Sequence, residues 1–352
     1  MEVKQESIFI SAVRSFCKVF AGLIGILVGG IIVAIVVGIM AKPHMFSDKT
    51  QLIIAADAGG NRSLLPPSSP VVLRLNIHGV IGAKDLNSKT IQSQLLDSQE
   101  GVLKGERVKA ILLHIKSPGG TAFDSHDIYQ SLMDYKEKFH VPIYAYVDGM
   151  CASGAMMVAC SAEKIFSAPI GMIGSVGVIM GPNFNFSELM EKYGVKQLTI
   201  TKGKDKDMLS PYRAWKPDED QSLKDIVAYD YKHFVDLVTS ARPRIDRNKL
   251  INVYGAQVYN PKTAQEYGYV DDGNSSYKKA LSELVSEAKI EGDYQVVELK
   301  VLHPVLSDLI EGKPPFLSGK VKHELSLPIE LSPELRNRSL YLYSPTLIKE
   351  QL

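Results

Sequence analysis

The sequence predicts an α/β domain with a largely parallel sheet, preceded by one N-terminal transmembrane helix. From residue 70 onward, short apolar runs typical of buried strands alternate with stretches of helical periodicity. Such alternation is typical of parallel strands joined by helices. An uncharged apolar stretch occupies residues 20–41. The chain of 352 residues could hold one large domain or two modest ones, and the absence of any repeated motif favours one.

Residues 20–41 form the expected transmembrane helix. At 1.5 Å per residue they span about 33 Å, enough for a hydrocarbon core of about 30 Å. The apolar part of a cleaved signal peptide is usually shorter, about 7–15 residues. Arg14 and Lys18 precede the stretch and Lys42 follows it. This modest asymmetry favours a cytoplasmic N-terminus, 1–19, and a globular domain outside the cytoplasm.

The rest of the chain divides into a tether, a globular domain and a C-terminal extension. Residues 42–69 are the expected tether, because Gly59-Gly60 and Pro66-Pro67 disfavour regular structure. The domain covers 70–301, and the extension covers 302–352. Within the domain we expect strands at 71–77, 110–115, 143–147, 164–167, 176–180 and 195–200, and helices at 124–139, 153–160, 187–193, 222–238 and 277–288.

Composition and motifs exclude several classes of function. The formal net charge of +1 and the lack of a basic stripe argue against nucleic-acid binding. Cys17, Cys151 and Cys160 have neither a metal-ligand spacing nor the pattern of a disulfide framework. There is no His-Glu-x-x-His, Cys-x-x-Cys or Walker loop, and the glycines at 171–181 match no dinucleotide fingerprint. We therefore expect neither a metal nor a cofactor.

Three short segments contain the candidate chemistry. Ser-Pro-Gly-Gly at 117–120 and Cys-Ala-Ser-Gly-Ala at 151–155 each follow an apolar strand-like run, and Lys-Asp-Lys-Asp-Met-Leu-Ser-Pro occupies 204–211. Together they offer a serine nucleophile, glycine amides for an oxyanion hole and a lysine amine as base. No histidine occurs between His140 and His233. Lysine is therefore the better candidate for the base.

In this order and at this spacing, the segments resemble the signal peptide peptidase A family of bacterial membrane serine proteases. The resemblance runs from about 70 to 301 and includes Gly-Ser-Val-Gly-Val at 174–178 and Ala-Gln-Glu-Tyr-Gly-Tyr-Val-Asp at 264–271. It implies a ClpP/crotonase-like fold, a Ser/Lys dyad and a ring-like homo-oligomer whose neighbouring subunits complete the substrate grooves. It also implies a place in the bacterial inner membrane, where the substrates are signal peptides that remain after secretion.

Ser153 is the expected nucleophile, and the backbone amides of Gly120 and Gly154 are the expected oxyanion hole. A serine at a strand-to-helix turn gains from nearby helix amides when negative charge develops. The same position also suits a helix cap, which is the structural alternative. Ala155 stands where the family usually has a second glycine, and this difference removes no reactive group.

Lys206 is the expected general base, because the resemblance places the catalytic lysine before Asp-Met-Leu-Ser-Pro. Lys204 is the next candidate and Lys202 is close by. A lysine must be neutral to accept a proton, and lowering its pKa by three from about 10.4 costs about 4 kcal/mol, so the assembled site must exclude water. The alternative is a solvated loop of alternating charges. Ser175 resembles the serine that orients the lysine amine by hydrogen bonding in this family, and the alternative is a serine at a strand end.

Three other functions remain open from the sequence. A related membrane protease acting on membrane proteins or misfolded exported proteins would have the same dyad. A non-catalytic membrane scaffold could use the same fold, although Ser153 and Lys206 argue against it. A crotonase-type acyl-CoA enzyme would also present paired glycine amides, but it would explain neither the transmembrane segment nor the serine at the turn.

Overall fold

A computed structural model describes residues 8–40, 49–302 and 340–342. The chain divides into two units, one formed by Met1–Lys49 with Leu302–Lys320 and the other by Thr50–Val301 with Val321–Leu352. In the first unit, helix α1 (Ile8–Met40) contains the stretch Ala12–Val33, which is long and apolar enough to cross a membrane. The expected single apolar helix near the N-terminus is confirmed, and Ala41 lies outside the described residues.

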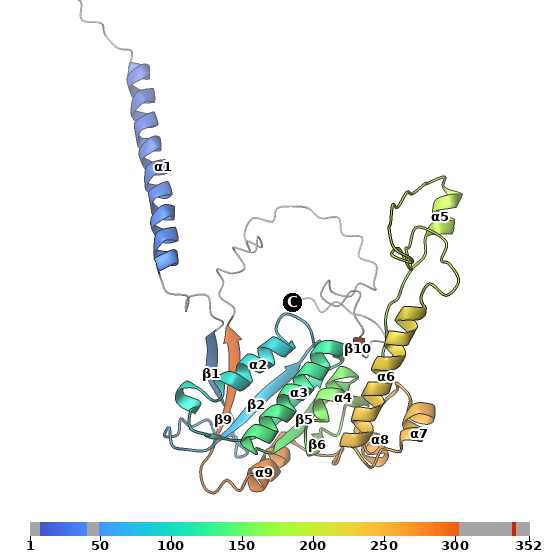
Figure 1. The fold of residues 1–352 in the computed structure, drawn as a ribbon. Coiled ribbons are helices and arrows are strands. Elements are labelled where there is room, and N and C mark those ends of the chain that lie inside the picture. Colours follow the sequence, from blue (N-terminus) through green and yellow to red (C-terminus); the bar gives the residue numbers. More distant parts are fainter. Residues whose placement is uncertain (1–7, 41–48, 303–339, 343–352) are drawn as a thin grey trace, which may run out of the picture. The chain divides into compact units, whose positions relative to one another are not determined.

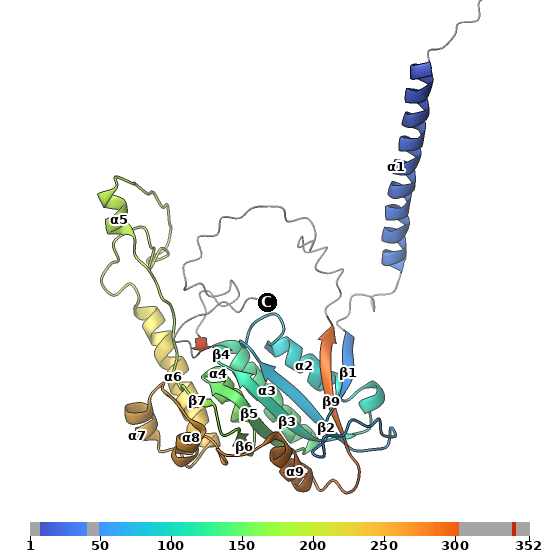
Figure 2. The ribbon, with the colours of Figure 1, turned by 180° about the vertical axis from the view of Figure 1, so that it is seen from behind.

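The second unit is built around a mixed sheet whose central strands are parallel (Figures 1 and 2). The pairs β2–β3, β3–β5, β5–β6, β5–β7 and β2–β9 are parallel, and β7–β8 is antiparallel. The predicted α/β class is confirmed. The strand order is β1 (Lys49–Ala55), β9 (Gln295–Leu302), β2 (Val71–His78), β3 (Val108–Ser117), β5 (Ile143–Ala152), β7 (Met172–Gly174) and β8 (Val258–Tyr259), with β6 (Lys164–Ser167) paired to β5.

Helices cover both faces of the sheet because alternate strand residues point to opposite sides. Leu73 and Leu113 belong to the larger core, which they share with helices α2, α3, α4 and α6. Val72 and Leu112 belong to the core formed with helix α9. Each such fully buried side chain contributes about 1.5–3 kcal/mol. The helices are α2 (Ser88–Asp97), α3 (Ala122–Phe139), α4 (Gly154–Ala159), α6 (Gln221–Ala241) and α9 (Tyr277–Glu287).

Residues 181–220 form an arm that extends from the sheet beyond the N-terminal end of α6 (Figures 1 and 2). Its helix, α5 (Ser187–Lys192), contains no buried residue. The other short elements are η2 (Gly101–Leu103), β4 (Gly119–Thr121), α7 (Arg247–Lys249), η3 (Leu250–Tyr254), α8 (Pro261–Tyr267) and β10 (Leu340–Leu342).

Two expected strands are wrong, at 176–180 and 195–200. In the first, the chain leaves the sheet after β7 because Gly174 and Ser175 both have positive φ, 123° and 56°. In the second, the residues lie exposed in the arm, where no described strand pairs with them. The other expected strands and helices of the domain are confirmed.

The ends of the domain also differ from expectation. The segment expected as a tether contains β1, which belongs to the sheet. Most of the C-terminal extension lies outside the described residues, but β10 is described and pairs with β4.

Candidate active site

Ser153 stands between the end of β5 and the start of α4 with an unusual backbone conformation, φ 55° and ψ −121°. Such a conformation costs a residue other than glycine about 1–3 kcal/mol and is typical of functional sites. The main chain is held in place, because Ser153 N donates to Gly174 O at 2.9 Å and Ser153 O accepts from Met156 N at 2.8 Å. The residue is only 1% exposed.

The hydroxyl group of Ser153 does not cap the helix. Its side chain accepts no hydrogen bond from α4. Its nearest hydrogen-bond partner among the described residues is Gly177 O, 3.5 Å from Oγ, which is at the limit of a hydrogen bond. The helix-cap interpretation is therefore wrong, and the backbone strain at Ser153 is not explained by capping.

The Gly119–Gly120 turn lies beside Ser153 because β3 and β5 are parallel neighbours, with Ser117 opposite Cys151. Gly119 has a φ of 95°. Gly120 needs to be glycine for a different reason, because a Cβ there would lie 1.8 Å from Ile81 O. The close approach to Ile81, rather than positive φ, excludes every other residue at position 120.

The direction of the Gly120 amide follows from its neighbours. Ile81 N donates to Gly119 O, and Thr121 N donates to Ile81 O, both at 2.9 Å. Because successive residues of a strand direct their main-chain groups to opposite edges, the N–H and C=O of Gly120 face away from Ile81. Strand β10 pairs with that edge in antiparallel register, with Tyr341 opposite Gly120.

Gly154 and Ser175 complete the group of residues around Ser153. Gly154 is buried at the first position of α4, where a backbone N–H has no partner within the helix. Ala152 of β5 is paired with Gly174 of β7, so Ser153 and Ser175 each follow one member of the pair. Ser175 is buried, and its N–H donates to Gln257 O at 2.6 Å.

Lys206 is not close to this group in the single chain. It lies exposed in the arm, and its amine has no hydrogen bond or ion pair with any described residue. The other two lysines offer no better geometry, since Lys202 is exposed and Lys204 is 94% exposed and contacts only Asp205, at 4.0 Å. The structure brings Ser153, Gly120, Gly154 and Ser175 together at one edge of the sheet, and it leaves Lys206 apart.

An open groove of about 630 Å³ begins at Gly177, whose carbonyl contacts Ser153. It runs between the segment after β7 and the first half of α6. Most of its lining is apolar, which suits an apolar ligand. The apolar lining residues are Val176, Val178, Ile179, Met180, Leu209, Leu223, Val227, Ala228, Tyr231 and Ala256.

Other reactive side chains do not compete with Ser153. Burial raises the pKa of both the Cys151 and the Cys160 thiols, the latter to about 12, so neither forms a thiolate at neutral pH. His114 contacts His78, and the His126 ring lies against the tilted ring of His233, with the ring centroids 4.8 Å apart. Within residues 8–40, 49–302 and 340–342, no group of three or more His, Cys, Asp or Glu side chains is placed to hold a metal ion.

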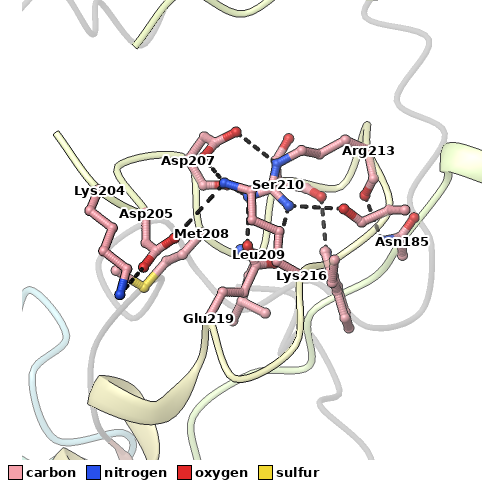
Figure 3. A network of polar contacts seen from close by, with 12 residues as sticks. Asn185, Lys204, Asp205, Asp207, Met208, Leu209, Ser210, Arg213, Lys216 and Glu219 are labelled. Carbon is pink, nitrogen blue, oxygen red and sulfur yellow. Dashed lines mark hydrogen bonds and ion pairs between the residues drawn. The ribbon is translucent and has the colours of Figure 1, made fainter. Parts of the chain in front are cut away.

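The sequence did not reveal the residues that hold the Lys206 loop. Arg213 binds both Glu219 and Asp207, and Asp207 follows Lys206 directly in the chain (Figure 3). Alternating Lys and Asp predicted only a solvated loop, and nothing in the pattern indicated which charges pair. A tight cluster of opposite charges within sixteen residues, 204–219, was the one available signal.

Comparison with known proteins gives a consistent result. The profile described as peptidase family S49 matches residues 136–291. The signal peptide peptidase SppA of Enterococcus faecium is 31% identical over 238 residues, which cover 66% of this chain and 68% of that protein. The chloroplastic serine protease SPPA of Arabidopsis thaliana is 27% identical over 227 residues, which cover 64% of this chain and 33% of that protein.

Among solved structures, a ClpP1 mutant from Listeria monocytogenes aligns with a TM-score of 0.39 and 16% identity, covering 59% of this chain and 94% of that chain. The α/β class follows from the parallel sheet and its covering helices alone.

A strained serine at the carboxyl end of a parallel sheet, with glycine amides beside it, is the arrangement of a hydrolase that uses a serine nucleophile. The family profile and the relatives narrow this class to peptidases. The chain belongs to peptidase family S49, and the resemblance to the signal peptide peptidase A family is confirmed.

Proposed function

We propose that the protein is a membrane-anchored endopeptidase in which Ser153 attacks the peptide carbonyl. The observation that carries this proposal is the strained, uncapped Ser153 next to two glycine amides. As the Oγ–C bond forms, the hydroxyl proton passes to the base, and the Gly120 and Gly154 amides stabilise the oxyanion. The base then protonates the leaving amine, and a water molecule hydrolyses the acyl-enzyme.

Lys206 is the proposed base, supplied by the arm of a neighbouring copy of the chain. Its exposure, and its lack of any contact with Ser153 in one chain, support an assembled site. Contact with another copy would also remove water from the amine, as a neutral lysine requires. Ser175 is proposed to accept a hydrogen bond from this amine and orient it.

The surface of the arm supports a homo-oligomer, and a ring is the arrangement that we propose. Exposed apolar side chains concentrated on one projecting segment are typical of a protein–protein contact, and head-to-tail contacts close into rings. The exposed apolar residues of the arm and of the segment that leads into it from β7 are Ile179, Phe184, Phe186, Leu189, Tyr193, Val195, Leu198, Ile200, Tyr212 and Trp215.

The proposed substrates are apolar peptides, of which signal peptides remaining in the membrane are the main class. The apolar groove at Gly177 supports this choice. The pairing of β10 with β4 supports an extended substrate that adds as an antiparallel strand along Gly120. The name of the Enterococcus faecium relative is consistent with the same substrate.

The proposed organisation keeps residues 1–19 in the cytoplasm, 20–41 as the anchor in a bacterial inner membrane and the protease domain on the extracytoplasmic side. The domain starts at Thr50 rather than at 70, because β1 is part of the sheet. The domain then extends to 301, and residues 302–352 remain a C-terminal extension.

A mixing experiment tests the proposal. Full-length protein in detergent is assayed with a fluorogenic peptide containing an apolar stretch. Ser153→Ala and Lys206→Ala are each expected to be inactive, and Lys204→Ala is the matched control that stays active. If the dyad forms between copies, mixing the two inactive variants in equal amounts restores activity at about a quarter of the sites. The Lys206→Ala chain supplies the intact serine and the Ser153→Ala chain the intact lysine, and random placement brings the two together that often.

Two results would contradict the proposal in different ways. Full activity of Lys206→Ala would show that the base is misassigned, with Lys204 next to be tested. Inactivity of every co-assembled mixture would show that Ser153 and Lys206 must come from one chain.

A further inference from the structure

Two carboxylates flank Lys206, and this is a problem for a residue that must give up its proton. Asp205 and Asp207 are its immediate neighbours, and Glu219 packs against the same loop through a hydrogen bond from Leu209 N, 3.2 Å from Oε1. A free carboxylate close to an amine favours the protonated amine. A loop of this composition can supply a neutral lysine only if its carboxylates are engaged elsewhere.

Arg213 engages two of the three carboxylates (Figure 3). Its Nε donates to Asp207 Oδ2 at 2.7 Å, and its Nη2 donates to Glu219 Oε2 at 2.6 Å. The hydrogen bonds from Arg213 lower the pKa of both carboxyl groups, so both are ionised and paired. The side chains are mostly enclosed, with 17% of Arg213, 20% of Asp207 and 2% of Glu219 exposed.

Arg213 also holds the main chain next to Lys206. Its Nη2 donates to Asp207 O at 2.8 Å, and its Nη1 donates to Ala214 O at 2.9 Å. Asn185, from the segment that precedes α5, donates from Nδ2 to Arg213 O at 2.9 Å. The planar guanidinium of Arg213 therefore links the loop that contains Lys206 to residues 213–219. A lysine cannot reproduce this geometry.

Lysines face the remaining carboxylate. Lys216 Nζ lies 3.8 Å from Asp205 Oδ1 and 3.7 Å from Asp207 Oδ1, and Lys204 Nζ lies 4.0 Å from Asp205 Oδ2. The charged residues near Lys206 in its own loop are Lys202, Lys204, Asp205 and Asp207. Those of the following segment that contact this loop are Arg213, Lys216 and Glu219.

We propose that Arg213 is a positioning residue for the base, which fixes the loop of Lys206 and neutralises the carboxylates that would otherwise hold its proton. This inference rests on the proposed function, since it assumes that Lys206 is the base. The inference concerns the protonation state of the Lys206 amine as well as its position. A purely structural role for Arg213 predicts no change in the pH profile.

The test compares pH profiles of kcat/KM, which report the titration of the free enzyme. For Arg213→Gln, two released carboxylates favour the protonated lysine, so the rise in activity is expected about half to one pH unit higher than in wild type. For Asp207→Asn, one carboxylate is lost and Arg213 keeps its charge, so the rise is expected at lower pH. Arg213→Gln combined with Asp207→Asn is expected to fall between the two single variants.

Two further variants separate charge from structure. Arg213→Lys keeps the charge but loses the paired hydrogen bonds, so kcat falls while the pH of the rise stays near that of wild type. Arg244→Gln is the matched control, because Arg244 lies outside the arm and contacts Gln265 O. It is expected to leave both kcat and the profile unchanged.

The outcomes distinguish this inference from the proposed function. If Lys206→Ala is inactive but Arg213→Gln and Asp207→Asn both keep the wild-type pH profile, the network is only structural and the inference is wrong. If Lys206→Ala keeps its activity, the proposed base itself is wrong. Should Arg213→Gln fail to fold, the shift of Asp207→Asn to lower pH still decides the matter, because a structural role predicts no shift.

Discussion

Tyr341 of β10 lies opposite Gly120 of β4, in an antiparallel register that continues from Leu340–Thr121 to Leu342–Gly119. Gly120 is the β4 residue whose main-chain groups face β10, and its N–H is the one that we assign to the oxyanion hole. Strand β10 therefore occupies the edge along which we expect a substrate to bind.

Weakening the pairing of β10 with β4 is expected to favour the binding of substrate along β4. Tyr341→Pro removes the backbone N–H that faces Gly120, so a larger fraction of chains has β4 open. An apparent KM reflects the competent fraction, and we expect it to fall about 2- to 10-fold with kcat unchanged. Steady-state kinetics on the fluorogenic peptide measures both.

Leu342→Pro is the matched control for Tyr341→Pro. Its N–H faces away from β4 in the same register, so its effect on KM is expected to be small. Equal KM values for wild type and Tyr341→Pro would contradict competition between β10 and substrate.

Gly120→Ala is expected to damage both stability and activity. The added Cβ would lie 1.8 Å from Ile81 O, so the strand must shift, at a cost of roughly 1–3 kcal/mol. The same shift moves the amide that we propose for the oxyanion hole, and kcat is expected to fall by about 10²-fold or more. Urea unfolding and kinetics measure the two effects.

Gly59→Ala is the control for Gly120→Ala. Its added Cβ meets the end of the flexible Asn61 side chain, and unfolding free energy is expected to stay within about 0.5 kcal/mol of wild type. A normal kcat for Gly120→Ala would show that the Gly120 amide does not belong to the oxyanion hole.

The backbone of Ser153 predicts a conflict between stability and activity. Glycine adopts positive φ without strain, so Ser153→Gly is expected to be more stable than Ser153→Ala by about 1 kcal/mol. Both variants lose the proposed nucleophile, and activity is expected to fall about 10⁴-fold or more. Thermal unfolding of the two variants measures the difference, and equal stability would mean that the φ of 55° stores no strain.

The low pKa of His114 predicts that the free energy of unfolding decreases in acid. Burial, and next the charge of Arg74, lowers the pKa of His114 from 6.5 to about 3. The unfolded chain therefore binds a proton that the folded chain does not, and stability is lost as pH falls from 6.5 toward 3, by up to about 1.4 kcal/mol per pH unit. Its Nδ1 also lies 2.7 Å from His78 Nε2, a contact that needs one neutral ring.

His114→Gln removes this titration. The difference in unfolding free energy between wild type and variant is expected to change with pH between 6.5 and 3 and to be constant above pH 7. A difference that is independent of pH throughout would contradict the low pKa of His114.

The sequence predicted the part of the site that depends on the sheet. Buried parallel strands are continuous apolar runs, so the strands before Gly119 and Ser153 could be located, and parallel strands end at the same edge. Residues 176–180 are equally apolar, yet they line a groove. The positive φ of Gly174 and Ser175 turns the chain out of the sheet before it reaches them. Apolar composition alone does not distinguish a strand from the wall of a groove.

The arm could not be predicted for a different reason. Residues 195–200 contain the β-branched residues Val195, Thr199 and Ile200, which are typical of a strand. A strand needs a partner, however, and the described part of the chain offers none there. The pairing of Arg213 with Asp207 and Glu219 depends on how the arm folds back on itself. Charge patterns within one loop do not determine such pairing.

The exposure of Lys206 has a consequence for when such an enzyme works. A single chain keeps Ser153 apart from Lys206, the proposed base, so under the proposed function it would be inert until it meets another copy. The rate would then rise more steeply than the number of chains, because each active centre needs an encounter between two of them. Anchoring by α1 would confine those encounters to two dimensions and raise the effective concentration. Crowding within the membrane would serve as the switch.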